Sequence, residues 1–539
     1  MFQKENARKL LFVDIAKSTG MLAAILTGIK VLGFVEKQVL AYYFGTGDTL
    51  DAYLTGFTLM VVFWDILRGL LAPSYLPTLI EYRSEAGERK SWEFTFTVLN
   101  LLSLLFVIVI AVSFLFSAQL ITLAAPGFQG ERLKMTVELT RLMLSGAVFF
   151  GLALITGFTL NSYKRFFLAI ADDLVFKVAG LLGLVLLVRY IGIYGLAWGI
   201  ALGSWLAPCL HLIGLRKYLC FYSPRIDLRL APLKKMFRLI LPLVAGTLCA
   251  EGRRVIDNWF ASFLAAGSIS ALSFAYKLIE FAFKSLAVPL ATVVFPYFSD
   301  LALQKDHTTL NDTLMTTLRM VALAFTPLAV CLLSLRTPVV RLLFERGAFD
   351  AASTQLTVSA VTFYAMGLTS VALDLILMRA YYSFSDTLTP SVTEVLTLLI
   401  HVGTIFLLRN VLGHGSIALA FSLSKTVKVI VLFLWLPKHQ VHIQAGRNLR
   451  FLGKIGLAAF SMYSAITVYA EGFIRLLGAS SYFLQALLIV SGALIGVGVF
   501  FILTFLLHIQ EVRDLAQTAV RMAKGEAKER FYARQDTDH

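Results

Sequence analysis

Charged residues are scarce in this sequence. Asp, Glu, Lys and Arg make up 15% of the 539 residues, whereas 58% are hydrophobic and the mean hydropathy is +0.77. A soluble chain of this length could not bury so much apolar surface. The composition therefore excludes an ordinary soluble enzyme or binding protein and indicates a chain whose surroundings are lipid.

Cysteine is also rare, and its spacing fits neither a metal site nor a disulfide framework. The four cysteines are scattered, mostly in or beside apolar runs: Cys209, Cys220, Cys249 and Cys331. The sequence lacks a phosphate-binding Walker loop, a His-Glu-x-x-His zinc motif and a Ser-His-Asp set on a soluble domain. We therefore expect no enzymatic activity and no resident cofactor. Uphill transport would have to draw on an ion gradient or on the membrane potential.

Long apolar runs fill the chain. A helix needs roughly 20 apolar residues to cross the hydrocarbon core of a membrane. The sequence therefore predicts an all-α polytopic membrane protein of about fourteen transmembrane helices. The predicted spans are 18–43, 51–80, 92–118, 135–161, 170–188, 192–215, 236–262, 269–299, 312–335, 352–380, 389–408, 413–436, 450–470 and 481–507.

Lys and Arg are concentrated in alternate loops. With a cytoplasmic N-terminus, the cytoplasmic loops hold most of the basic residues, whereas the opposite loops 44–50 and 263–268 hold none. The one clear exception is the loop with Arg336, Arg341 and Arg346. An even number of spans then places both termini in the cytoplasm. The net charge of +15 is therefore explained by the basic residues of the cytoplasmic loops. It does not indicate nucleic-acid binding, because the sequence has no basic stripe with interleaved aromatic residues.

The sequence repeats itself at one constant offset. Residues of the first half recur in the second, with Phe44, Ala52, Leu59, Leu67, Leu71, Ala72 and Pro77 matching Phe263, Ala271, Leu278, Leu286, Leu290, Ala291 and Pro296. The loop Ala125-Pro126-Gly127-Phe128 resembles Arg346-Gly347-Ala348-Phe349 at nearly the same distance. The offset spans six predicted helices, an even number, so both copies have the same orientation. Parallel repeats of this kind form the two lobes of many transporters, with the substrate site between them.

The repeat predicts the domain organisation. Helices 1–6 form an N-terminal lobe (1–222), helices 7–12 a C-terminal lobe (223–440), and residues 441–507 the last two helices. Residues 508–539 form a basic cytoplasmic tail. This tail is either an amphipathic segment on the anionic inner leaflet, with Val512, Leu515, Ala519 and Val520 on its apolar side, or a disordered polar end.

Ionisable residues cluster inside the predicted spans, where they cost free energy and usually face a cavity or a partner. Two clusters occupy equivalent parts of the repeats: Lys30, Glu36, Lys37, Asp51, Asp65 and Arg68, and Glu251, Arg253, Arg254, Asp257, Lys277, Glu280 and Lys284. Other intramembrane charges are Arg141, Asp172, Asp173, Lys177, Asp374, Glu394, Lys425 and Lys428. Surplus cations suit phosphate oxygens. The alternative is a set of internal salt bridges and snorkelling lysines.

Several segments resemble the MurJ-type (MviN) lipid II flippases. The similarity covers essentially the whole chain and is most specific in residues 31–34, 44–47, 51–53, 125–128, 260–268, 277–281 and 344–349. The resemblance implies membership of the multidrug/oligosaccharidyl-lipid/polysaccharide exporter superfamily and a place in the bacterial inner membrane. It also implies alternating-access movement of an undecaprenyl-pyrophosphate-linked saccharide, first of all lipid II for peptidoglycan synthesis, from the cytoplasmic to the periplasmic leaflet.

The resemblance further implies a cationic, arginine-rich substrate cavity, which this chain matches only in part. Two of the positions where the family has arginine hold lysine here, Lys30 and Lys277. Three others hold Glu36, Trp64 and Asp65, with Lys37 beside the first and Arg68 one turn beyond the last two. The acidic residue of the family is kept as Asp51. We therefore expect the substrate site to include Lys30, Lys37, Asp51, Arg68, Lys277 and Glu280.

Some relatives carry a sodium site among helices 7, 11 and 12, and Asp257 aligns with an acidic member of it. Glu394 and Thr397, on one face of predicted helix 11, would add oxygen ligands. A proton is the alternative coupling ion, since a carboxyl in apolar surroundings titrates nearer neutrality. A structural ion pair between Asp257 and Arg254 is the remaining alternative.

Other functions stay open at this point. The chain could be a flippase for an exopolysaccharide or O-antigen repeat unit, or a membrane scaffold for cell-wall synthesis that has lost transport. The missing arginines favour the scaffold, and the intact repeat opposes it. A glycosyltransferase would need a catalytic carboxylate motif or a longer loop. The expected partners are the lipid-linked glycan and membrane lipids, and cell-wall synthesis proteins stay open.

Overall fold

The computed structural model describes residues 27–304, 306–441, 444–478 and 481–513. Throughout these residues the regular structure is helical and contains no strand. A first helical stretch covers residues 27–44. It is followed by α2 (Asp48–Ala86), α3 (Glu88–Leu115), α4 (Ser117–Ala124), α5 (Gly130–Ser162), α6 (Phe166–Ile191), α7 (Tyr194–Leu215), η1 (Arg216–Phe221), α8 (Ala231–Ala261) and α9 (Ser268–Leu303).

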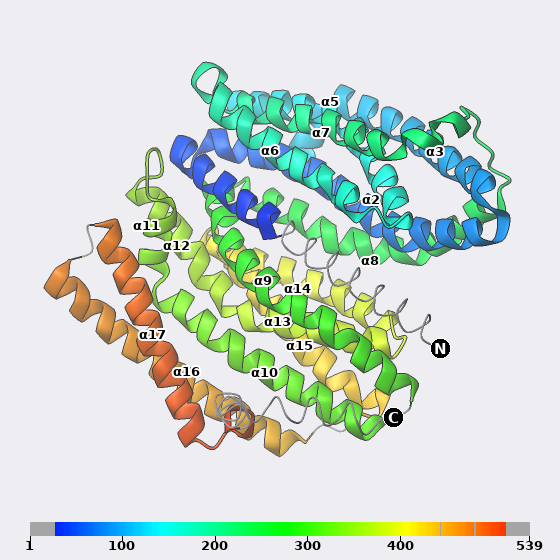
Figure 1. Ribbon diagram of the computed structural model, residues 1–539. Coiled ribbons are helices and arrows are strands. Elements are labelled where there is room, and N and C mark those ends of the chain that lie inside the picture. Colours follow the sequence, from blue (N-terminus) through cyan, green and yellow to red (C-terminus); the bar gives the residue numbers. More distant parts are fainter. Residues whose placement is uncertain (1–26, 305, 442–443, 479–480, 514–539) are drawn as a thin grey trace, which may run out of the picture. The chain divides into compact units, whose positions relative to one another are not determined.

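The remaining helices continue in the same manner (Figure 1). They are α10 (His307–Ser334), α11 (Arg336–Phe344), α12 (Ala351–Met366), α13 (Leu368–Ser383), α14 (Leu388–Leu412), α15 (Gly415–Trp435), η2 (Leu436–His439), α16 (Ala445–Leu477) and α17 (Tyr482–Leu506).

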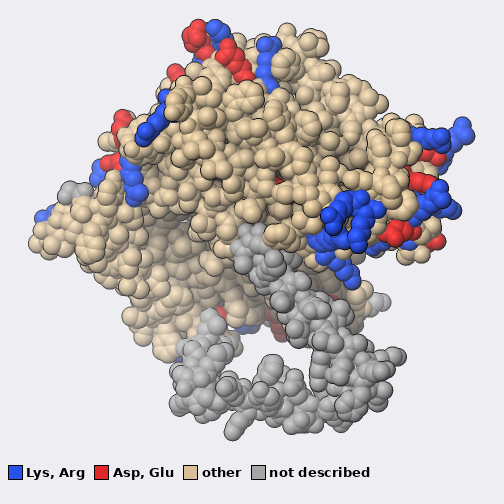
Figure 2. All heavy atoms as spheres, turned by 45° about the horizontal axis from the view of Figure 1, so that its top comes forward, with Lys and Arg blue, Asp and Glu red and all other residues tan. Residues whose placement is uncertain are grey.

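The predicted membrane spans are confirmed as helices wherever the structure describes them, and residues 18–26 of the first span lie outside the described residues. Within the described ranges, eleven helices are long and apolar enough to cross a membrane, and the pair α12 and α13, bent by 43°, makes a twelfth span. The two other predicted spans correspond to the stretch 27–44 and to α8, whose apolar character is interrupted by Glu251, Arg253, Arg254 and Asp257. On the face in Figure 2, charged side chains gather in groups separated by wide uncharged stretches, as lipid contact requires. The chain is thus an all-α, multi-pass membrane protein.

The described chain divides into two compact units. Of the described residues, 27–274 and 344–356 belong to the first unit, and 275–343 and 357–513 belong to the second. The lobes 1–222 and 223–440, the pair of helices in 441–507 and the basic tail 508–539 stay predictions. Most of that tail, from residue 514 onward and including Leu515, Ala519 and Val520, lies outside the described residues.

Close packing of small residues shapes the first unit. Its helices α5, α6 and α7 lie side by side (Figure 1). A Cβ atom on Gly199 would lie 2.4 Å from the carbonyl oxygen of Ala179, and one on Gly183 would lie 2.5 Å from that of Gly195. In lipid, helices associate through van der Waals contact rather than a hydrophobic driving force, so small residues allow the close approach that stabilises them.

The segment that follows α17 packs within the second unit. Ile509 and Val512 are buried in a cluster with residues of α10, α16 and α17. Arg319 of α10 donates to the carboxylate of Glu511 at 2.9 Å and to the side-chain oxygen of Asn448 at 2.8 Å. Residues 509–513 therefore pack on protein, which differs from both alternatives expected for the start of the tail.

The bend between α12 and α13 lies at Gly367. The hydroxyl of Ser422, on α15, donates to the backbone carbonyl of Phe363 at 2.7 Å. A Cβ atom on Gly367 would lie 2.4 Å from the Ser422 oxygen, so glycine at this position lets α15 approach the break. The bend thus has an identifiable local cause in glycine and an inserted side chain.

Candidate functional site

The acidic residues of the first two spans pair with basic residues of other helices. Glu36 is 7% exposed and accepts a hydrogen bond from Lys177 of α6 at 2.8 Å. Asp65 of α2 pairs with Arg254 of α8 at 2.7 Å. Glu36 and Asp65 stand at positions where the lipid II flippases have arginine. Each of them therefore has a basic partner on another helix of the first unit.

The predicted cations of the first unit occupy different surroundings. Arg68 pairs with Asp173 of α6 at 3.5 Å, and the two side chains are 41% and 38% exposed. Lys37 donates to the hydroxyl of Ser273 at 2.9 Å. Lys30 is partly exposed on the first helical stretch. A substrate role for Lys30, Lys37 and Arg68 stays a prediction, but the half-exposed ion pair of Arg68 is of the weak, exchangeable kind.

Asp51 is fully buried, and both of its carboxylate oxygens are engaged. Oδ2 accepts from Arg132 at 2.7 Å and from the backbone N–H of Gly267 at 2.8 Å. Oδ1 accepts from the backbone N–H of Ser270 at 2.7 Å. Negative charge is favourable at the start of a helix, and Gly267 and Ser270 flank the start of α9. These contacts give Asp51 a structural task, which is to join α2, α5 and the start of α9.

Four loops of the first unit contact one another, and we call them the interlocked end: residues 45–47, 125–129, 262–267 and 345–350. The backbone N–H of Ala348 donates to the carbonyl of Tyr42 at 2.8 Å. The hydroxyl of Thr46 donates to that of Ser353 at 2.9 Å. The N–H of Gly127 donates to the hydroxyl of Ser262 at 3.1 Å. Segments from both sequence repeats are therefore joined by hydrogen bonds within one compact unit.

Two glycines permit this contact. A Cβ atom on Gly127 would lie 2.2 Å from the carbonyl oxygen of Ser262, and one on Gly347 would lie 2.3 Å from that of Tyr42. The two glycines belong to the two loops that resemble one another in sequence. Each packs against the end of the first span of the other repeat. The sequence repeat thus predicts related loops, and the structure shows that they pack reciprocally.

Aromatic side chains and a helix cap add to the interlocked end. The rings of Phe34, Phe274, Phe344 and Phe349 pack together with centroids 5.2 to 6.2 Å apart. Asp350 precedes α12, and its carboxylate accepts from the N–H of Ser353 at 2.8 Å. This hydrogen bond lowers the pKa of Asp350. The carboxylate is therefore ionised at neutral pH and fixes the residue that contacts Thr46.

In the second unit, Lys277 and Glu280 form part of a triad on α9. The carboxylate of Glu280 pairs with Lys277 at 2.9 Å and with Lys284, one turn further, at 2.6 Å. The three side chains are 24%, 21% and 47% exposed in the order Lys277, Glu280, Lys284. Two ammonium groups share one carboxylate, so the triad carries a net charge of +1.

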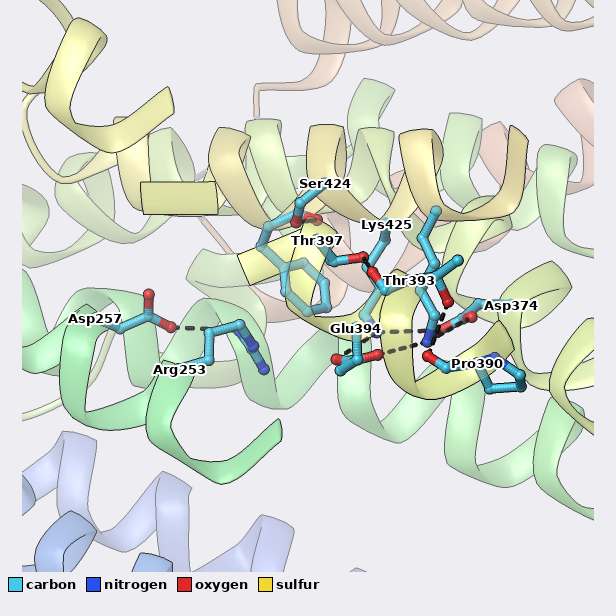
Figure 3. A network of polar contacts seen from close by, with 11 residues as sticks. Arg253, Asp257, Asp374, Pro390, Thr393, Glu394, Thr397, Ser424 and Lys425 are labelled. Atoms are coloured by element: carbon cyan, nitrogen blue, oxygen red, sulfur yellow. Dashed lines mark hydrogen bonds and ion pairs between the residues drawn. The ribbon is translucent and has the colours of Figure 1, made fainter. Parts of the chain in front are cut away.

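A second charged group joins α13, α14 and α15. Nζ of Lys428 lies 3.0 Å from Asp374 and 2.6 Å from Glu394, and its side chain is 2% exposed. Lys425 lies 3.0 Å from Asp374 and 3.6 Å from Glu394. Figure 3 shows the carboxylates of Asp374 and Glu394 directed toward one another across these contacts.

The residues expected for a sodium site have other partners. Asp257 pairs with Arg253 at 3.3 Å, whereas Glu394 pairs with Lys428. The hydroxyl of Thr397 donates to the carbonyl of Thr393 at 2.6 Å. Over the part of the chain that the structure describes, no three His, Cys, Asp or Glu side chains converge as a metal site. The observed partners do not match an open cation site at Glu394, and sodium coupling stays a prediction.

Three residues that the sequence analysis left without a role contact predicted site residues. Arg132 contacts Asp51, Asp173 contacts Arg68, and Lys284 contacts Glu280. Only the last contact, between residues four apart on one helix, could have been found from spacing alone. Arg132 lies 81 residues from Asp51, where no periodicity links the two.

Known proteins resemble this chain over most of its length. The family model described as "Lipid II flippase MurJ" matches residues 40–488. The probable lipid II flippase MurJ of Rickettsia prowazekii is 26% identical over 502 residues, which cover 91% of this chain and 97% of that protein. The lipid II flippase MurJ of Burkholderia cenocepacia is 25% identical over 443 residues, which cover 80% of this chain and 85% of that protein.

Solved structures show the same fold. A lipid II flippase MurJ in an inward closed conformation aligns with a TM-score of 0.73 at 22% identity, covering 89% of this chain and 98% of that one. An inward-facing multidrug resistance transporter of the MATE family aligns with a TM-score of 0.67 at 15% identity, covering 76% of this chain and 94% of that one.

Proposed function

Because this chain belongs to the lipid II flippase MurJ family, we propose that it moves lipid II across the bacterial inner membrane from the cytoplasmic to the periplasmic leaflet. The observation that carries the proposal is the family match, which runs from residue 40 to residue 488 and so includes nearly all the spans and loops. The names of the curated relatives favour lipid II over an exopolysaccharide or O-antigen precursor. The same family match and the names of these relatives argue against a scaffold that has lost transport.

The interlocked end supports an alternating-access mechanism. In our proposal it faces the periplasm, because the loop charge bias assigns residues 44–50 and 263–268 to that side. Both termini are then cytoplasmic. All of the described contacts there are hydrogen bonds and packing, so they can break and re-form during a transport cycle. A protein closed in this way accepts substrate from the cytoplasm and releases it when the interlocked end opens.

The triad of Lys277, Glu280 and Lys284 supports binding of the pyrophosphate of the substrate. Its net positive charge favours a polyanion, and the partial exposure of the side chains lets a ligand compete for the two ammonium groups. We propose that Lys30, Lys37 and Arg68 make further phosphate contacts, whereas Asp51 shapes the protein without touching substrate. An ion gradient or the membrane potential supplies the energy for net transport.

Complementation tests this function. The chain is expressed in a strain depleted of its own lipid II flippase, and arrival of labelled precursor in the periplasm is measured. Wild-type protein should restore arrival, and Lys277→Ala should reduce it by roughly 5- to 150-fold at unchanged abundance, as expected for loss of about 1–3 kcal/mol in a charge–phosphate contact. Arg475→Ala is the control, because the Arg475 side chain is 80% exposed. Membrane-inserted wild-type protein that restores no arrival contradicts the proposal.

Reporter fusions test the orientation. Fusions at residues 47, 225 and 530 should report the periplasm, the cytoplasm and the cytoplasm, because basic residues accumulate in cytoplasmic loops. A periplasmic signal at residue 225 would overturn the proposed topology and with it the side assigned to the interlocked end.

A further inference from the structure

The second unit contains a buried charge cluster outside the proposed phosphate contacts. Two carboxylates, Asp374 from α13 and Glu394 from α14, pair with one ammonium group, that of Lys428 on α15. Figure 3 labels the two carboxylates. Nζ of Lys428 lies 3.0 Å and 3.3 Å from the two oxygens of Asp374 and 2.6 Å from one oxygen of Glu394. The ammonium group donates to Oδ2 of Asp374 and to Oε2 of Glu394, and Oδ1 of Asp374 lies within ion-pair distance.

We propose that Lys428 is a built-in counter-cation. Its ammonium occupies the position at which Asp374 and Glu394 would otherwise hold a free monovalent cation such as Na⁺. The side chain is 2% exposed and comes from a third helix, so it joins α13, α14 and α15 in the way that a bound ion would. The charged cluster of wild-type protein therefore needs no dissolved ion.

The charge balance supports this assignment. The two carboxylates and the ammonium groups of Lys425 and Lys428 sum to zero. Removal of the Lys428 ammonium leaves one uncompensated negative charge in a buried place, which is strongly destabilising. Carboxylate oxygens are ligands that alkali and alkaline-earth cations prefer. The vacated space between two carboxylates is thus a site for a small monovalent cation.

Lys425 offers a matched control. It contacts the same carboxylates, but at 3.0 Å and 3.6 Å, and its side chain is 15% exposed. Lys425→Met removes the same charge as Lys428→Met, yet it leaves the Lys428 ammonium between the carboxylates. A free cation should therefore find no vacancy in the Lys425 variant.

Thermal unfolding of the purified full chain in detergent tests the proposal. Each protein is heated in sodium chloride and in N-methyl-D-glucamine chloride at equal ionic strength. The wild-type Tm should be the same in both. For Lys428→Met the Tm should fall by roughly 3–5 °C in N-methyl-D-glucamine, as for loss of one partner of a buried pair in a chain of this length. It should rise again with sodium in a saturable manner, whereas Lys425→Met should show no saturable sodium effect.

Two results would overturn the proposal. One is a saturable increase of the wild-type Tm with sodium that Lys428→Met abolishes, because Lys428 would then be part of an ion site rather than its occupant. The other is a loss of stability in Lys428→Met that neither sodium nor potassium relieves.

A double variant covers the case in which Lys428→Met does not accumulate. The variant with both Asp374→Asn and Lys428→Met has a neutral cluster, so it should accumulate and show no response to sodium. Failure of this variant to accumulate also contradicts the proposal. None of these measurements involves lipid II, so their outcome is independent of the proposed transport function.

Discussion

Replacing Gly127 with alanine places a methyl group against the backbone of the loop 262–267. The new Cβ would lie 2.2 Å from the carbonyl oxygen of Ser262 and 2.8 Å from the backbone nitrogen of Phe263. Cβ contacts below 3.0 Å essentially never occur, so the two loops must separate by about 0.8 Å, the difference between 3.0 Å and 2.2 Å. Because the contacts are with backbone atoms, no change of rotamer relieves them.

The cost of this overpacking sets the expected effect. Forcing a methyl group into a filled space typically costs about 1–3 kcal/mol. A cost of about 2 kcal/mol lowers the ratio of closed to open interlocked end by about 30-fold, since about 1.4 kcal/mol corresponds to tenfold. The Gly127→Ala protein should therefore spend more time open.

Disulfide formation between Thr46→Cys and Ser353→Cys measures closure. The two hydroxyl oxygens lie 2.9 Å apart, so cysteines at these positions approach each other only when the end is closed. The four native cysteines are first replaced. Oxidation should be markedly slower in the Gly127→Ala background than in the parent.

Gly47→Ala is the control for this experiment. Gly47 has an extended backbone, and a Cβ there meets no atom within 4 Å. Its substitution should leave cross-linking unchanged. Parental cross-linking in Gly127→Ala, or equal slowing in Gly47→Ala, would refute the idea that the Gly127 contact maintains closure.

Three further predictions follow from the pairs described above. Glu36→Gln leaves Lys177 beside a neutral group and should lower the free energy of unfolding by roughly 3 kcal/mol, whereas the double variant with Lys177→Met should lose less. Equal losses in thermal unfolding would contradict this pairing. Glu511→Gln removes the partner of a buried arginine on α10 and should speed proteolysis of the segment after α17, while Glu471→Gln, on a side chain 63% exposed, should not. The lowered pKa of Asp350 means that its stabilising effect is fully present above the ordinary carboxyl pKa of about 4 and is lost as the pH falls through the lower folded-state value. The Tm difference between wild type and Asp350→Ala should thus be constant from about pH 8 to 5 and vanish in stronger acid, and a difference that vanishes near neutral pH would exclude this role.

The membrane spans could be predicted from the sequence because hydropathy over about 20 residues is a local property. Even α8, with four charges near its end, lies where its flanking apolar residues predict it. The predicted spans and the observed helices differ mainly at their ends, where polar residues extend several helices beyond the hydrocarbon-sized run.

The pairing of charges could not be predicted, because it depends on which faces of distant helices meet. Glu36 and Lys177 are 141 residues apart, and Asp65 and Arg254 are 189 residues apart. The sequence shows that all four residues are charges within predicted membrane spans. It does not show that Lys177 and Arg254 pair with Glu36 and Asp65, the two acidic residues that stand where the family has arginine. The first cluster contains three basic and three acidic side chains, and the partners Lys177 and Arg254 add two positive charges from α6 and α8.

Asp51 shows the limit of reasoning from resemblance. Its retention beside a cationic region suggests a substrate contact, but its partners are Arg132 and two backbone N–H groups 216 and 219 residues away. No helical or strand period connects such positions. Burial and hydrogen bonding, which decide the role of a carboxylate, become visible only when the start of α9 is placed against α2.

The serine at the bend of α12 and α13 bears on how the protein moves. In hydrocarbon, a backbone carbonyl without a donor costs several kcal/mol. The carbonyl of Phe363 is satisfied by the Ser422 hydroxyl from α15. If α15 moved away from the break, this carbonyl would lose its hydrogen-bond donor. We therefore expect one rigid body made of the last turns of α12, all of α13 and this part of α15. Flexing during transport must then occur at other places along the chain.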